Sequence, residues 1–364
     1  MLDFTLDQEQ EMLATIIGRF AEERVRPVFR EAEERGAVPA EVIQAGWELG
    51  LLPTSLPAAY GGLGDYSVVT AAIAVEAFAW GDLATTFQIL APNLVAVPLL
   101  LEGSQAQQTR YLPDFTTARR PPAVTAALIE PGIRFNPRAL KATATIEGDG
   151  YRLNGAKTMV PLAEDAELLL VYAAEAGETQ AFLVPGDAEG LTVGPEAEVM
   201  GLGALPLYRL HLENVYVPAV DRLGGEEGSD FARLLNHSRV ALAAAAVGVA
   251  RAGYEYAREY AKQRVQFGEP IAHRQSIAFM LAEMAIDIEA ARLLVWEAAW
   301  KLDRGEEITR EATVMKHYVD DVVLQTADRA VQILGGYGYI REYPVELWLR
   351  NARGFVHFDG LAIV

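Results

Sequence analysis

The sequence predicts a mostly helical protein with a β domain at its centre. Three observations support this: helical periodicity over the first hundred residues, short β-rich runs in the next hundred, and three long helical segments after them. The chain has 364 residues and is 51% hydrophobic, which is enough for several domains with a large core. We therefore expect an N-terminal helical domain over 1–120, a middle antiparallel β domain over 121–224 and a C-terminal helical bundle over 225–364.

The first domain shows repeated helix signals. Near the start, a helical register places five apolar side chains on one stripe, opposite acids and arginines: Met12, Ile16, Ile17, Phe20 and Val25. Pro39 and Gly50 then mark the start and end of a second helix. Apolar helical stretches follow at 66–80 and 83–101, with a shorter one at 105–115. These signals predict a helical domain.

The middle segment changes to short runs rich in β-formers. Such runs lie at 167–173, 181–185, 191–194, 208–213 and 215–218, divided by Gly, Pro and acidic turns. Within "YRLNGAKTMV", Asn154-Gly155 is the dipeptide that tight hairpin turns prefer. The pattern predicts a small antiparallel β domain with a hairpin at that dipeptide.

The last third returns to helix. Long helical segments are expected at 229–264, 275–304 and 309–334, and the first is nearly all Ala and Val at its centre, so it should be buried on most sides. Gly335-Gly336 is a plausible helix end. A short helix at 345–353 then leads into "GFVHFDGLAIV".

Composition excludes several classes of function. The net charge of −19 repels phosphate backbones and anionic lipid, so neither nucleic acid nor a membrane is expected as the main partner. There is no cysteine, and the five histidines form no i, i+4 ligand pair, so no metal site is expected. Residues 1–13 lack the basic and apolar regions of a signal peptide. These observations favour a cytoplasmic protein.

Two stretches in the second half of the chain have unusual sequences: "RVQFGEPIAHRQ" (264–275) and "QILGGYGYIREYPVELWLRNAR" (332–353). Both resemble segments of the acyl-CoA dehydrogenase family. So do "ELGLLPTSLPAAYGGLGD", "EGSQAQQTRYLPD", "IEPG", "YRLNGAKTMV" and "LHLENVYVPAVDRLGG", in the same order. The resemblance covers essentially the whole chain and implies an N-terminal helical domain, a central β domain and a C-terminal four-helix bundle.

The resemblance also implies a chemistry. The family binds FAD and oxidises an acyl-CoA thioester to the trans-2-enoyl-CoA. A carboxylate removes the α-proton while the β-hydrogen leaves as hydride to flavin N5. Electrons then pass to an electron-transferring flavoprotein. By resemblance the protein would be a homotetramer or homodimer, with a mixed oligomer as the alternative.

Site residues follow from the matching positions. By resemblance, Asp359 occupies the position of the catalytic base, and Arg239 matches the arginine beside it. Arg264 and Phe267 would meet the FAD diphosphate and adenine across a subunit interface. The remaining cofactor positions are Gln275, Gln332, Gly335, Gly336 and, at the flavin, Ile129 and Met159.

Several positions depart from the family pattern. Asp359 is one methylene shorter than the usual Glu, Ile129 replaces a hydroxyl donor, Phe135 replaces a Ser, and Met159-Val160-Pro161 stands for Trp-Ile-Thr. The family's final helix is also not expected after Val364, so retention of FAD stays open. Asp359 could equally be an exposed acid at the chain's end, and Arg239 an ordinary salt-bridged helix residue.

Three interpretations remain open at this point. The first is a working dehydrogenase with an unusual thioester substrate. The second is a family member without flavin chemistry that serves as a CoA-ester-binding or partner subunit of a mixed oligomer. The third is a flavoprotein oxidase that uses Asp359 as its base. No single position sets the length of the acyl chain.

Overall fold

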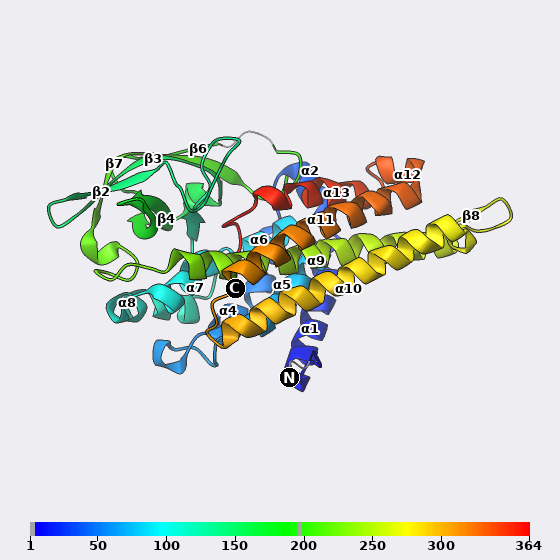
Figure 1. The fold of residues 1–364 in the computed structure, drawn as a ribbon, viewed down its shortest axis with the longest axis horizontal. Helices are drawn as coiled ribbons and strands as arrows, with labels where there is room; N and C mark the ends of the chain where they lie inside the picture. Colours follow the sequence, from blue (N-terminus) through cyan, green and yellow to red (C-terminus); the bar gives the residue numbers. More distant parts are fainter. Residues whose placement is uncertain (1–3, 196–198) are drawn as a thin grey trace.

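The computed structural model describes residues 4–195 and 199–364. Of residues 1–13, which lack the features of a signal peptide, the first three lie outside the described part. The β domain sits at one end of an elongated helical body (Figure 1). Long helices run from beside the sheet towards the opposite end, where a small hairpin projects.

The N-terminal helices are α1 (Gln8–Phe20), α2 (Phe29–Arg35), α3 (Ala40–Trp47), α4 (Leu51–Ser55), α5 (Val68–Gly81), α6 (Leu83–Ile89), α7 (Asn93–Glu102) and α8 (Gln105–Thr117). Asp7 and Gln10 form a capping box at the start of α1, because each side chain accepts a hydrogen bond from the other's backbone N–H. The helix expected at 83–101 is two helices bent by 52°, with Pro92 as the N-cap of α7.

The apolar stripe predicted near the start is only partly buried. Ile17, Phe20 and Val25 lie in the core, whereas Met12 is 56% exposed and Ile16 is 48% exposed. The prediction was therefore wrong for these last two residues. A π-helical turn over Ala21–Val25 follows α1, so residues before and after it do not keep one common helical register.

The sheet contains β1 (Val124–Ala127), β2 (Thr143–Glu147), β3 (Gly150–Pro161), β4 (Leu168–Glu175), β5 (Glu178–Pro185), β6 (Leu191–Pro195) and β7 (Leu207–Pro218). The strand order is β1-β4-β2-β3-β7-β6, with β5 on β4. Most pairs are antiparallel, but β1–β4 and β2–β4 are parallel. The antiparallel expectation fails for these two pairs: β5 occupies one edge of β4 along its whole length, and β1 and β2 both lie along the other edge, parallel to β4.

The hairpin predicted at Asn154-Gly155 does not exist. β3 continues through both residues, with a register shift against β7 at this point. Asn154 Oδ1 accepts the N–H of Asn214 at 2.9 Å. A Cβ on Gly155 would lie 2.7 Å from Ala142, and its φ is +144°. The dipeptide thus marks a bulge and a close backbone approach rather than a turn.

The C-terminal helices are α9 (Phe231–Gln263), α10 (Gln275–Asp303), α11 (Thr309–Leu334), α12 (Gly336–Tyr339) and α13 (Val345–Gly354), followed by a 3₁₀ turn, η6 (Phe355–His357). The strands β8 (Val265–Gln266) and β9 (Glu269–Pro270) form the hairpin that projects beyond the bundle (Figure 1). α9 packs against α5, α10, α11 and α13, and its Ala/Val centre is buried on all sides, as predicted.

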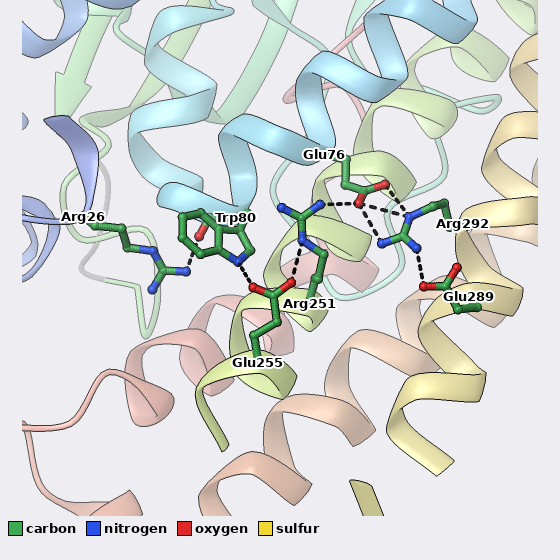
Figure 2. A network of polar contacts seen from close by, with 7 residues as sticks. All are labelled: Arg26, Glu76, Trp80, Arg251, Glu255, Glu289 and Arg292. Atoms are coloured by element: carbon green, nitrogen blue, oxygen red, sulfur yellow. Dashed lines mark hydrogen bonds and ion pairs between the residues drawn. The ribbon is translucent and has the colours of Figure 1, made fainter. Parts of the chain in front are cut away.

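A buried polar network links the two helical regions. Glu76 of α5 accepts from Arg251 of α9 at 2.8 Å and from Arg292 of α10 at 2.9 Å (Figure 2). Arg251 also pairs with Glu255, which accepts from Trp80 Nε1 at 2.8 Å. Since Glu76 is only 6% exposed, both arginines are needed to keep its charge satisfied. The N-terminal helices and the bundle therefore form one core.

Within residues 4–195 and 199–364, no single helix combines the length and apolarity needed to cross a membrane; the bent pair α6 and α7 does so only when the two are taken together. The same residues contain no cluster of three or more His, Asp or Glu side chains that could hold a metal ion.

Candidate active site

Asp359 faces Arg239 across the top of the bundle. The guanidinium Nη2 lies 3.9 Å from Asp359 Oδ2, and the two side chains are 16% and 22% exposed respectively. Asp359 directly follows η6, and Arg239 lies in the first third of α9. The expected pairing of these two residues is present in the structure. Asp359 is therefore not an exposed acid at the end of the chain.

The backbone around Asp359 is fixed on both sides. Phe358 is 4% exposed and Leu361 is 3% exposed, so apolar packing holds the residues that flank the carboxylate and its following glycine. Gly360 has φ +85°, and a Cβ there would approach Leu128 to 2.8 Å, so only glycine fits. Its N–H donates to Ser238 Oγ at 3.1 Å.

Arg239 has one further partner and one unused donor. Its Nη1 donates to Thr313 Oγ1 of α11 at 2.9 Å. Its Nε is buried and has no hydrogen-bond partner among the described residues. A buried guanidinium donor without an acceptor is costly, and such groups often mark a position that a ligand or an ordered water completes.

The space beside Asp359 is apolar and closed. A cavity of about 20 Å³ is lined by residues of α7, β1, β4, α9 and the end of the chain, among them Leu128, Leu234, Ser238, Gly360 and Ile363. That volume admits about one water molecule. Phe358, which precedes Asp359, meets Phe87 edge-on at 6.1 Å between ring centroids.

The predicted flavin-facing residues lie on the neighbouring part of the β domain. Ile129 is buried, and its carbonyl accepts the N–H of Thr158 at 2.9 Å. Met159 has φ +53° at a register shift between Lys157 and Val160. A left-handed conformation at a non-glycine residue costs energy and is concentrated at functional sites, so the bulge is a candidate cofactor contact.

A buried ion pair supports this part of the sheet. Lys157 Nζ lies 2.9 Å from Glu130 Oε1, and Lys157 is fully buried. Burial lowers the pKa of Lys157 to about 8, although Glu130 acts in the opposite direction. Glu130 also accepts the N–H groups of Lys141 and Ala142 at 2.7 and 2.8 Å. Glu130 thereby joins the two ends of the loop that carries Phe135.

A second group of predicted residues forms a separate cleft at the far end of the bundle. Arg264, Gly335 and Gly336 line an open cleft of about 390 Å³, together with Tyr260 and Tyr337. Arg264 stacks over the Tyr337 ring at 5.2 Å, and no carboxylate of the described residues lies within ion-pair distance of it. A Cβ on either glycine would meet no atom within 4 Å. The cleft thus offers a cation and open backbone to an anionic group.

The remaining predicted cofactor residues do not line this cleft. Gln275 and Gln332 are exposed on their helices. Phe267 is 93% exposed at the tip of the β8–β9 hairpin, with φ +54°, and Arg274 lies 5.8 Å from its ring. The Phe267 ring thus has the Arg274 side chain as a neighbour and otherwise projects into solvent, in a left-handed backbone conformation that is costly for a non-glycine residue.

The two groups of residues are far apart. Arg239 and Arg264 are separated by 25 positions of sequence, nearly all of them within α9. At about 1.5 Å per residue the separation is about 37 Å. The Arg264 cleft and the Asp359–Arg239 pair of one chain are therefore two well-separated sites.

Comparisons with known proteins identify the family of this chain. Sequence profiles of the acyl-CoA dehydrogenase N-terminal, middle and C-terminal domains match residues 7–119, 125–215 and 229–362. The caffeyl-CoA reductase–Etf complex subunit CarC of Acetobacterium woodii is 35% identical, over 98% of this chain and 96% of that protein.

Solved structures show the same fold. The butyryl-CoA dehydrogenase of Megasphaera elsdenii superposes with a TM-score of 0.89 at 32% identity, covering 100% of this chain and 96% of that one. The FAD complex of PigA also gives a TM-score of 0.89, at 25% identity, covering 99% and 96%. The chain belongs to the acyl-CoA dehydrogenase family. It is an FAD-dependent oxidoreductase of that fold, as the sequence predicted.

The residues present fit this cofactor. The Arg264 cleft, with two glycines that leave open space, suits a diphosphate, and the bulge at Met159 suits the edge of a flat ring. Three residues that hold the surroundings of Asp359 were not predicted from the sequence. Ser238 accepts the N–H of Gly360, Thr313 accepts from Arg239, and Lys316 donates to the Phe355 carbonyl. The signal for Lys316 was available, since a Lys and an Asp four residues apart stand among apolar positions of α11.

Proposed function

We propose that this protein oxidises a short acyl-CoA thioester to the 2-enoyl-CoA, with Asp359 as the base that takes the α-proton. The observation that carries the proposal is the Asp359–Arg239 pair at 3.9 Å, set beside an apolar cavity, with Gly360 packed against Leu128 of the β domain. A carboxylate in such a position can act as general base, a role worth about 10²- to 10⁴-fold in rate.

Each residue has a defined task in this proposal. Asp359 Oδ accepts the α-proton, and Arg239 orients the carboxylate. The chemistry that FAD would supply, when bound, is a hydride acceptor for the β-carbon. Phe358, Leu361 and Ile363 exclude water, which strengthens the charge interactions at the reacting carbon.

The walls of the site favour a short acyl group. Phe358, the residue before Asp359, packs edge-on against Phe87 at 6.1 Å and against Phe355 at 5.3 Å, so the chain at Asp359 is held by aromatic packing. Entry of a thioester requires the lining side chains to move, because the cavity is about 20 Å³ in this structure. The similarity to a butyryl-CoA dehydrogenase supports the same substrate range.

We include a homo-oligomer in the proposal, as a dimer or tetramer. Phe267 and Arg264 would then meet the FAD that serves a partner's Asp359, since the two sites of one chain are about 37 Å apart along α9. The exposed face of α10 supports this, because Phe279, Ile286 and Leu293 recur at intervals of seven residues and are 59%, 67% and 40% exposed. Electrons would pass to an electron-transferring flavoprotein, the kind of partner named in the complex that contains CarC.

The reverse reaction is the second candidate. CarC is named as a subunit of a caffeyl-CoA reductase, so reduction of a 2-enoyl-CoA is a specific alternative. The same residues would serve: protonated Asp359 would give its proton to the α-carbon. A subunit without flavin chemistry and an oxidase with Asp359 as base are the further alternatives.

The visible spectrum of the purified protein separates these functions. Protein incubated with FAD should show a flavin band that bleaches anaerobically with butyryl-CoA, and less with long-chain thioesters. Bleaching that reverses rapidly in air would indicate an oxidase. Chemically reduced protein that is reoxidised by crotonyl-CoA or an aryl-acrylyl-CoA, without bleaching by saturated esters, would assign the reductive direction. A protein that takes up no FAD would overturn the proposal in favour of a partner subunit.

A further inference from the structure

A buried ion pair lies directly beneath the turn that carries Asp359. Lys316 Nζ is 2.6 Å from both carboxylate oxygens of Asp320, one turn along α11, and the side chains are 9% and 8% exposed. Desolvation of two charges offsets most of their attraction, so such a pair is weak evidence of a stabilising role. Its position suggests a different use.

Lys316 makes a third contact, outside its own helix. Its ammonium also donates to the backbone carbonyl of Phe355 at 2.8 Å. Phe355 begins η6, four residues before Asp359, and is fully buried. The ammonium thus has three acceptor atoms, in a side chain that is only 9% exposed. It fixes the backbone from which the catalytic turn departs.

The other side of the turn is fixed by a different helix. Ser238 of α9 accepts the N–H of Gly360. Asp359 therefore lies between two anchored points. The Phe355 carbonyl is held by Lys316 of α11, and the Gly360 amide is held by Ser238 of α9. A side chain held from both sides loses little conformational freedom when it reacts.

The pair also contributes charge. Burial raises the pKa of Asp320, Lys316 lowers it, and the negative charge of Asp359 raises it further. Asp320 and Asp359 are therefore close enough for their charges to interact. Arg239 of α9 faces Asp359 directly, whereas Lys316 and His317 of α11 act on Asp320, which in turn interacts with Asp359; His357 is exposed on η6. The buried Lys316–Asp320 pair thus lies next to the half-buried Arg239–Asp359 pair.

The geometry points to Lys316 and Asp320 as positioning residues for Asp359. Lys316 holds the turn in place, and Asp320 neutralises Lys316, so that Arg239 is the net counter-charge of the base. Neither residue touches the substrate. This inference rests on the proposed role of Asp359 and adds to it two residues that act through the backbone and through charge.

The test uses FAD-loaded protein and the pH dependence of flavin bleaching by butyryl-CoA in single turnover. Lys316→Met should lower the rate about a hundredfold, with KM changed less than about threefold, because the turn shifts while substrate contacts remain. It should also move the acid limb of the profile to higher pH. Asp320→Asn should move the same limb to lower pH, by about half a unit or more. A structural defect alone would not shift the two limbs in opposite directions.

Lys301→Met is the matched control, because Lys301 forms an i, i+4 pair with Glu297 on α10 at 2.9 Å, away from the site. It should leave rate and profile unchanged. If Lys316→Met does not fold, Asp320→Asn still tests the charge, because it keeps the contact of Lys316 with Phe355. Unchanged profiles, or shifts in one direction, would overturn the inference while Asp359→Asn remained inactive. An Asp359→Asn protein with full activity would instead overturn the proposed function itself.

Discussion

The backbone N–H of Gly360 donates to Ser238 Oγ at 3.1 Å, and these two residues are the immediate neighbours of Asp359 and Arg239. One hydrogen bond therefore sets the register between the last residues of the chain and α9. The 3.9 Å separation of carboxylate and guanidinium depends on that register.

Ser238→Ala should lower both stability and rate. It leaves the buried Gly360 N–H without its acceptor, a cost of about 1–3 kcal/mol. We expect a lower melting temperature by calorimetry and slower flavin bleaching with butyryl-CoA. Ser55→Ala is the control, since Ser55 Oγ donates only to Leu51 O within its own helix. Equal melting temperatures for the two variants would show that the hydrogen bond from Gly360 to Ser238 does not stabilise the fold.

Asp359→Asn should slow flavin bleaching by about 10²- to 10⁴-fold, because the amide cannot accept the α-proton. FAD content and binding of butyryl-CoA should persist, which anaerobic stopped-flow and a spectral binding titration measure separately. Asp321→Asn, an exposed carboxylate on α11, should behave as the wild type. A normal bleaching rate in Asp359→Asn would assign the base elsewhere.

Gly336→Ala should leave folding intact but weaken FAD binding about tenfold or more. A Cβ at this position meets no atom of the protein within 4 Å, so the fold tolerates it, yet it occupies the open space of the Arg264 cleft. Gly18→Ala, in α1, is the matched control with equally open space. Fluorescence titration with FAD reports the affinity. Identical affinities in both variants would exclude the cleft as a cofactor site.

Ile286→Glu should dissociate the oligomer. The side chain is 67% exposed at the centre of the apolar stripe on α10, where a buried carboxylate in an interface would be costly. Light scattering after gel filtration should give a smaller particle, and FAD should bind more weakly because the partner's contribution is lost. Ile133→Glu, at a fully exposed residue outside the stripe, should change neither measurement. An unchanged mass for Ile286→Glu would place the interface on another face.

Acid should destabilise the fold through His237. Burial lowers the pKa of His237 to about 4, below its ordinary value of 6.5. Between these values the unfolded chain binds a proton that the folded chain does not, so stability is complete above pH 6.5 and falls as the pH approaches 4. At about pH 5 the loss from this residue should be about 2 kcal/mol.

Urea unfolding at two pH values measures that loss. His237→Asn should be less sensitive to acid than the wild type, because the titrating ring is gone. His273→Asn should keep the wild-type sensitivity, since His273 is 63% exposed. The explanation fails if His237→Asn keeps the full pH dependence.

The helices could be predicted from the sequence because each carries its own local signal. The long segments of the bundle match the structure closely, since Gly335 ends α11 and the Ala/Val centre of α9 is buried on all sides. Asn154-Gly155 misled because its local preference for a hairpin is overridden by pairing with β7 and by the close approach of Ala142. The dipeptide itself carries no information about these tertiary contacts.

The site was predictable by resemblance only in part. The Asp359–Arg239 pairing and the grouping of Arg264 with Gly335 and Gly336 were anticipated and are present. The roles of Ser238 and Lys316 were not anticipated, because both act on backbone atoms, of Gly360 and Phe355. The Lys316–Asp320 spacing indicates an ion pair on α11 but not the contact with Phe355.

The network around Glu76 has a consequence for how this protein can be recombined with its relatives. Glu76 lies in the first part of the chain, whereas the two arginines that neutralise it, Arg251 and Arg292, lie in the last. A chimera that exchanges residues 1–120 alone inherits one member of this charge triad without the other two. Replacing 121–224 leaves the triad whole. In a chimera, the N-terminal and C-terminal helical regions should therefore come from the same parent protein, whereas the segment 121–224 can be exchanged without breaking the triad.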